Sequence, residues 1–182
     1  LIRNGTNELV WQQMPSMINH RCLHAIAKVG SKIIVAGGLE VNNGPFDTLS
    51  GTMNSVECFD TNNPAAGWQA LPPIPGHSRC ASAAVGIGSK LYLFGGTYND
   101  GINYIRMDES LVFDMNSNTW SSLPPLPKGR SGACAIADQD KNIFIIGGYT
   151  IPPTDHPEPN YYCNEVLIFD TINNTYRQMP SL

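Results

Sequence analysis

Residues 91–96 read Leu-Tyr-Leu-Phe-Gly-Gly, an apolar run that ends in two glycines. The same arrangement occurs twice more in the chain, and the copies follow one another at intervals of about 50 residues. The three copies are Ile33–Gly38, Leu91–Gly96 and Ile143–Gly148. A period of this length indicates a structure built from repeated units.

Four further markers keep the same register around each glycine pair. An arginine precedes the pair, a Phe-Asp pair follows it, an aromatic residue comes next, and Leu-Pro or Met-Pro ends the repeat. The arginines are Arg21, Arg79 and Arg130, and the aromatic residues are Trp68, Trp120 and Tyr176. The head of the chain carries the same ending, with Trp11 followed by Met14-Pro15. Five markers in register exclude a chance similarity.

The apolar segments within each repeat are short, and turn residues separate them. Lys32–Ala36 is rich in β-branched residues, which is typical of a strand. Gly30-Ser31, Gly88-Ser89 and residues 140–142 stand where tight hairpins would join the first two strands. No window shows a sustained apolar period of 3.6 residues. Four short strands in a repeat of about 50 residues predict a blade of a β-propeller.

The full pattern, from about Trp11 to Pro180, resembles the kelch repeat. The resemblance implies an all-β fold, a kelch-type β-propeller of three four-stranded blades plus one leading strand at Leu9–Met14. We expect residues 1–15 to hold the outer strand of a preceding blade. Residues 16–73, 74–125 and 126–182 are then blades 1, 2 and 3.

Blade number sets a further expectation. Propellers close with four to eight blades. Three blades therefore predict part of a larger propeller, or a propeller that another chain completes. We expect self-association through the open blade edges.

Composition excludes several classes of protein. Only 14% of the residues are charged, and the net charge is −4, so we expect no nucleic-acid partner. No apolar stretch reaches the length needed to span a bilayer, and no membrane partner is expected. The odd number of widely spaced cysteines predicts free, buried thiols and no metal site or cofactor. The cysteines are Cys22, Cys58, Cys80, Cys134 and Cys163.

The three arginines are the first candidate ligand-binding residues. In kelch-like blades, the loop that enters the first strand and the loop between the second and third strands open on one face. The resemblance therefore implies that the arginines surround one mouth of the propeller channel, with His20 and His77 beside Arg21 and Arg79. Each guanidinium either bonds backbone carbonyls of the adjacent blade or helps to bind an acidic group. The two interpretations are compatible.

The loops after the glycine pairs are the second candidate. They span residues 39–54, 97–108 and 149–164, and loops of this length are often functional. They place aromatic rings beside amides and carboxylates, which suits recognition of a sugar or a peptide. The candidate ligand-binding residues in these loops are Tyr98, Tyr104, Tyr149 and Tyr161.

Two functions of different classes are consistent with this pattern. The first is a binding module that recognises an acidic or polar peptide or protein through the arginines and loop aromatics. This function would suit a cytoplasmic adaptor.

The second function is that of a sugar mutarotase or epimerase. Residues 129–132, 145–150 and 164–167 are similar to bacterial kelch proteins of the sialic acid mutarotase type. Mutarotation needs a cation for the sugar carboxylate and a group that moves a proton. Under this hypothesis Arg130, with Arg79, holds the carboxylate, and a loop group such as Glu40 or His156 moves the proton. A periplasmic or secreted location would suit it.

Overall fold

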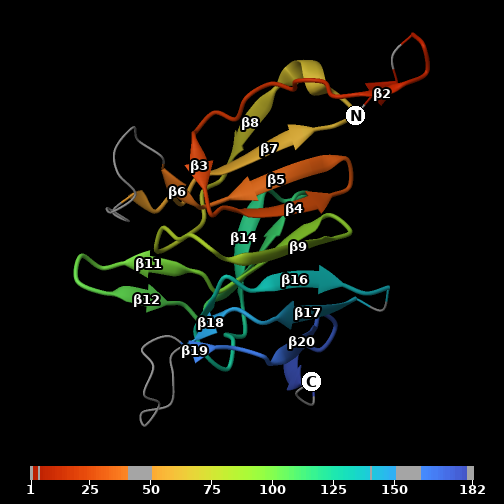
Figure 1. Ribbon diagram of the computed structural model, residues 1–182. Helices are drawn as coiled ribbons and strands as arrows, with labels where there is room; N and C mark the ends of the chain where they lie inside the picture. The colour runs from red at the N-terminus through yellow and green to blue at the C-terminus, as the bar shows by residue number, and fades with distance from the viewer. Residues whose placement is uncertain (1, 4, 41–50, 140, 151–160, 180–182) are drawn as a thin grey trace.

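The computed structural model describes residues 2–3, 5–40, 51–139, 141–150 and 161–179. All paired strands among them are antiparallel, and three four-stranded sheets stand side by side (Figure 1). The described residues include a short 3-10 helix, Pro64–Ala66, and none of their helices is long and apolar enough to cross a membrane. The predicted all-β propeller fold is confirmed, with a blade number consistent with part of a propeller.

Each blade orders its strands as they follow in the chain, from the inner to the outer edge. Blade 1 consists of β4 (Ala25–Val29), β5 (Lys32–Ala36), β7 (Val56–Asp60) and β8 (Trp68–Leu71). Blade 2 consists of β9 (Ala83–Ile87), β10 (Lys90–Phe94), β13 (Ser110–Asp114) and β14 (Thr119–Leu123). Blade 3 consists of β16 (Cys134–Ala137), β17 (Asn142–Ile146), β20 (Val166–Asp170) and β21 (Thr175–Gln178). These sheets lie within the residue ranges expected for the blades, whose exact boundaries stay a prediction.

Small sheets extend the blades on one side, which we call the loop face (left in Figure 1). They are the pair β3 (Arg21–Cys22) and β6 (Leu39–Glu40), the pair β11 (Thr97–Asn99) and β12 (Tyr104–Arg106), and the trio β15 (Arg130–Ser131), β18 (Tyr149–Thr150) and β19 (Tyr161–Tyr162). The opposite side, the turn face, holds the hairpin turns of the blades. The predicted turns at Gly30-Ser31 and Gly88-Ser89 are among them.

The leading strand differs from its prediction. It covers only β2 (Leu9–Val10) instead of Leu9–Met14, and it pairs with β1 (Ile2–Arg3). Trp11, the next residue, is 88% exposed. Residues 11–17 form no strand. That this pair belongs to a preceding blade stays a prediction.

Neighbouring blades pack closely at their inner strands. Alternate residues of β4, such as Ala27 and Val29, are buried in a cluster that includes Leu91 and Leu93 of blade 2. A Cβ atom at Gly86 of β9 would lie 2.0 Å from the Lys28 carbonyl oxygen. Side chains larger than hydrogen are excluded at this contact, which explains why small residues dominate the inner strands.

The aromatic residue of each fourth strand links its blade to the end of the preceding repeat. It donates a hydrogen bond to the carbonyl of a proline that ends the preceding repeat. The bonds are Trp68 Nε1 to Pro15 at 3.0 Å, Trp120 Nε1 to Pro72 at 2.9 Å, and Tyr176 Oη to Pro124 at 3.2 Å. Each ring also packs on the phenylalanine of its own Phe-Asp pair.

The glycine pair is where the next blade docks its main chain. Gly96 N donates to the Arg130 carbonyl at 2.8 Å, and a Cβ at Gly95 would lie 2.1 Å from the same oxygen. Gly38 and Gly37 meet the Arg79 carbonyl in the same way. A side chain at the first glycine would therefore push two blades apart.

The five cysteines are free thiols, as predicted. Cys58, Cys80 and Cys163 are buried and Cys22 is half-buried, but the prediction is wrong for Cys134, which is exposed. Cys134 lies on the side of β16 that faces away from blade 2, where no described residue covers it.

Candidate functional site

The three arginines occupy equivalent positions on the loop face, and each guanidinium is enclosed by its own blade. Arg21 Nη1 donates to the Gly37 and Ser55 carbonyls at 2.7 and 3.0 Å, and Arg21 forms an ion pair with Glu57. Its side chain is 0% exposed. The positive charge of Arg21 is therefore neutralised inside the fold by Glu57.

Arg79 and Arg130 repeat the arrangement. Arg79 pairs with Glu109 and also reaches the Gly95 carbonyl. Arg130 pairs with Glu165 at 2.8 Å and donates to the Gly147 carbonyl at 3.1 Å. Both side chains are 1% exposed.

The bonding of the arginines divides between two blades. One interpretation expected the arginine side chains to bond carbonyls of the adjacent blade. They bond carbonyls of their own blade instead. The main chains of Arg79 and Arg130 make the bonds to the neighbouring blade, through its glycine pair. This geometry gives the arginines a structural task, and their binding of a ligand stays a prediction.

The glutamate partners were missed in the sequence, because they have no constant position in the repeat. Glu57 lies two residues before Phe59, whereas Glu109 and Glu165 lie four residues before their Phe-Asp pairs. The carboxylates also differ in exposure, with side chains 1%, 40% and 22% exposed for Glu57, Glu109 and Glu165. An acidic residue between the glycine and Phe-Asp markers is the signal that could have found them.

Glu57 is the most enclosed of the three carboxylates. Burial acts to raise its pKa, but donors from Asn19, Ile18 and Arg21 outweigh burial and bring the pKa below its ordinary value. The amides of Ile18 and Asn19 donate at 2.7 and 3.1 Å, and Asn19 Nδ2 donates at 2.9 Å. The segment that enters blade 1 therefore closes this site.

Two predicted ligand-binding residues of blade 2 come together on the loop face. The rings of His77 and Tyr98 stack with centroids 4.3 Å apart and an interplanar angle of 7°. Tyr104, on the adjoining strand β12, is 49% exposed.

Blade 3 places a second aromatic pair on the same face. Tyr149 and Tyr162 have ring centroids 4.7 Å apart. Their mutual hydrogen bond and charge raise the pKa of Tyr149. Tyr162 is 71% exposed, so this pair is accessible.

The remaining predicted residues are placed as follows. Glu40 is exposed on β6, opposite Arg21 in the β3–β6 ladder, and His20 is exposed in the segment before Arg21. Tyr161 pairs through its backbone with Thr150. His156 lies outside the described residues.

A pocket of about 290 Å³ opens beside the His77–Tyr98 stack. Its walls come from the segment entering blade 2 and from the β11–β12 hairpin with the residues that follow it. The lining residues are Gly76, His77, Tyr98, Ile105, Arg106, Met107, Asp108 and Glu109. We call it the Tyr98 pocket.

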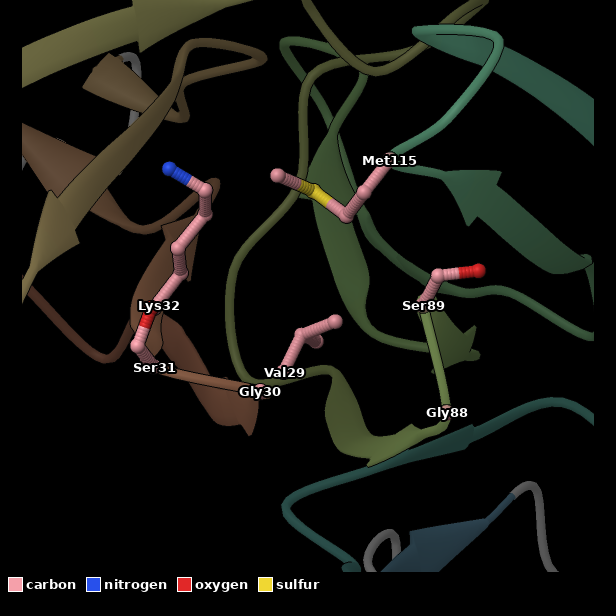
Figure 2. A pocket seen from close by; sticks show the side chains of 7 residues that line it. All are labelled: Val29, Gly30, Ser31, Lys32, Gly88, Ser89 and Met115. Atoms are coloured by element: carbon pink, nitrogen blue, oxygen red, sulfur yellow. The ribbon is translucent and has the colours of Figure 1, made fainter.

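A second pocket, of about 220 Å³, lies on the turn face between blades 1 and 2. Figure 2 shows Lys32 on one side of it, and Ser89 and Met115 on the other. The Lys32 ammonium forms an ion pair with Asp60 at 3.2 Å, and the Ser89 hydroxyl accepts a hydrogen bond from Asn116 at 3.0 Å. These polar groups are already bonded within the protein, so the Tyr98 pocket is the stronger candidate.

The model of the KLHDC2/KLHL20/DRC7 Kelch-repeats domain matches residues 5–181. Kelch repeat and BTB domain-containing protein 2 of Cowpox virus (strain GRI-90 / Grishak) is 28% identical over 187 residues, which cover 96% of this chain and 30% of that protein. N-acetylneuraminate epimerase of Vibrio vulnificus (strain YJ016) is 28% identical over 133 residues, covering 71% of this chain and 32% of that enzyme.

These relatives are longer proteins, and the chain spans about 30% of their length. The solved structure named "Structure of YjhT" aligns with a TM-score of 0.74 over 93% of this chain and 54% of that chain. Its sequence identity of 17% makes it evidence of the fold alone.

Proposed function

Because this chain belongs to the kelch-repeat family, we propose that it is a protein-binding module and that its loop face makes the contact. The single observation that carries the proposal is the gathering of accessible aromatic rings there, with His77–Tyr98 on one blade and Tyr149–Tyr162 on the next. Exposed rings supply large apolar contact area with little loss of conformational freedom, and interfaces are enriched in them.

The proposed ligand is a peptide or protein segment at the channel mouth. The aromatic pairs, and not the arginines, are the main contact, because each guanidinium is enclosed and paired with a glutamate. An acidic ligand would have to displace one of these glutamates. The arginines act by holding the loop face in shape.

The test removes the rings and leaves the blades intact. Tyr98→Ala/Tyr162→Ala is compared with Ile172→Ala, which trims an apolar residue, 71% exposed, in a turn-face hairpin. Proteins that co-purify with the wild-type chain are identified, and their affinities for purified variants are measured. We expect binding at least about tenfold weaker for the tyrosine variant, as for the loss of interface hot spots, and unchanged binding for Ile172→Ala. The opposite pattern would place the binding surface elsewhere.

The sialic acid mutarotase alternative is favoured by one observation, the similarity to N-acetylneuraminate epimerase over 71% of this chain. It needs a free cation for the sugar carboxylate, whereas Arg79 and Arg130 already pair with glutamates. NMR of anomer exchange in N-acetylneuraminate tests it. Acceleration over buffer would support this alternative, and its absence would remove it.

A further inference from the structure

The Arg79–Glu109 pair differs from its counterpart in blade 1 in one respect that bears on the proposed binding face. Arg79 engages Glu109 Oε2, and no described residue donates to the second oxygen, Oε1. The Glu109 side chain is 40% exposed and lines the Tyr98 pocket. An ion pair in blade 2 therefore presents an open carboxylate oxygen to a cavity.

Blade 1 shows what complements such a carboxylate. There, the peptide segment before Arg21 donates two backbone amides and the Asn19 side-chain amide to Glu57. The corresponding segment before Arg79 includes Gly76 and His77, and His77 turns to Tyr98 instead. The donors present in blade 1 are thus missing at Glu109, among the described residues, and a cavity stands beside the carboxylate.

The walls of the Tyr98 pocket select the rest of the ligand. Tyr98, Ile105 and Met107 form an apolar side, and its volume of about 290 Å³ lies at the lower end of ligand pockets, which suits a side chain or two of a peptide. Carboxylates outnumber cations among the charged lining groups that water can reach. Asp108 is exposed, Glu109 and Arg106 are both half-buried, and Arg79 is 1% exposed.

Resting on the proposed function, we propose that the Tyr98 pocket receives a peptide in which an apolar residue adjoins a lysine or arginine. The apolar side chain lies against Tyr98 and Ile105, and the cationic group donates to Glu109 Oε1. The partner of the loop face is thereby a basic and apolar segment, in place of the acidic peptide that three free arginines would have favoured.

The probes for this proposal are three acetylated, amidated pentapeptides, Gly-Leu-Lys-Leu-Gly and the same peptide with Gln or Glu in place of Lys. They are titrated into the isotope-labelled 182-residue chain, and backbone amide shifts are followed by NMR. We expect the lysine peptide to shift the amides of Gly76, Met107 and Glu109. The Gln peptide should bind at least about threefold more weakly, and the Glu peptide more weakly still.

Variants of the pocket test the contribution of its carboxylates to peptide binding separately from that of its apolar wall. Glu109→Gln should weaken the lysine peptide by at least about tenfold, as expected for a lost hydrogen bond to a charged group. Asp108→Asn should weaken it about twofold to fivefold, as for an exposed charge pair. Asp100→Asn is the matched control at the tip of the same hairpin, outside the pocket, and should bind as the wild type does.

Glu109→Gln leaves Arg79 without its counter-charge, so a second variant keeps the proposal testable if that chain unfolds. Ile105→Ser preserves the ion pair, and it should weaken both the lysine and the Gln peptide. Equal binding of the lysine and Glu peptides, or unchanged binding by Ile105→Ser, would overturn the proposal.

The peptide experiment and the test of the proposed function can fail independently of each other. If Tyr98→Ala/Tyr162→Ala loses a protein partner while the lysine peptide leaves the pocket amides unshifted, the pocket chemistry is wrong and the loop face still binds.

Discussion

Replacing Arg21 with methionine tests the structural task of the arginines. The substitution removes the cation beside Glu57, whose side chain is 1% exposed, and it takes donors from the Gly37 and Ser55 carbonyls. Removing one member of a buried ion pair costs about 3–5 kcal/mol, because the remaining charge is buried without its partner. The amides of Ile18 and Asn19 still bond Glu57, so we expect a loss near the lower end, about 3 kcal/mol.

The same substitution in the other blades gives a graded series. Water can reach Glu165 and Glu109, whose side chains are 22% and 40% exposed. The free energy of unfolding should therefore fall least for Arg79→Met, by about 1–2 kcal/mol, and by an intermediate amount for Arg130→Met.

Urea unfolding followed by tryptophan fluorescence measures the series, and the m-value is checked for each variant. The double variant Arg21→Met/Glu57→Gln should recover at least about 1 kcal/mol, because it no longer buries an unpaired carboxylate. Equal losses at the three positions, or a loss below about 0.5 kcal/mol for Arg21→Met, which is ordinary for a surface change, would refute the reasoning.

Three further predictions concern single groups. Gly95→Ala should lower the free energy of unfolding by more than about 2 kcal/mol, with about 3 kcal/mol expected, because its Cβ would meet the Arg130 carbonyl. Gly101→Ala has open space around it and should cost only about 1 kcal/mol. Thermal melting compares the two variants, and equal losses would contradict the docking role of the glycine pair. The pKa of Glu57 is lower in the folded than in the unfolded chain, so its carboxylate stabilises the fold at a pH above the unfolded pKa. This contribution is lost as the pH falls through the folded pKa, and Glu57→Gln should therefore flatten the acid limb of the plot of stability against pH. An unchanged acid limb would show that other groups determine it. Burial raises the pKa of the Cys80 thiol to about 11. At pH 8, iodoacetamide should therefore modify the exposed Cys134 first and leave Cys80 unmodified, as measured by mass spectrometry of the folded protein. Early labelling of Cys80 would mean that its blade opens.

The strands of this protein could be predicted because each rests on local signals. Gly30 has a φ of +59°, which suits the tight turn between β4 and β5, and Lys32–Ala36 is rich in β-branched residues. The glycine pair also has a local signature, although the reason for it, the carbonyl of the next blade, is a contact between repeats. Position within a repeat was enough to predict the fold.

The site was harder to predict because it depends on contacts between segments with no fixed spacing. Arg79 could be placed, but its partner Glu109 follows 30 residues later and the equivalent spacing differs in the other blades. The stack of His77 on Tyr98 requires the segment before blade 2 to lie against β11, which only the packing of the blades establishes. Sequence reasoning therefore left the arginines either bonded to carbonyls of the adjacent blade or available to an acidic group, whereas the fold pairs each of them with a glutamate of its own blade.

The most direct measurement is site-specific photo-crosslinking to the bound partner. A photoreactive phenylalanine is placed at Tyr98 or Tyr162 on the loop face, and at Asn62 or Ile172 in turn-face hairpins, all on the wild-type background. The proposed binding mode predicts crosslinks to the partner from Tyr98 and Tyr162 and none from Asn62 and Ile172. Crosslinks confined to Asn62 and Ile172 would contradict it.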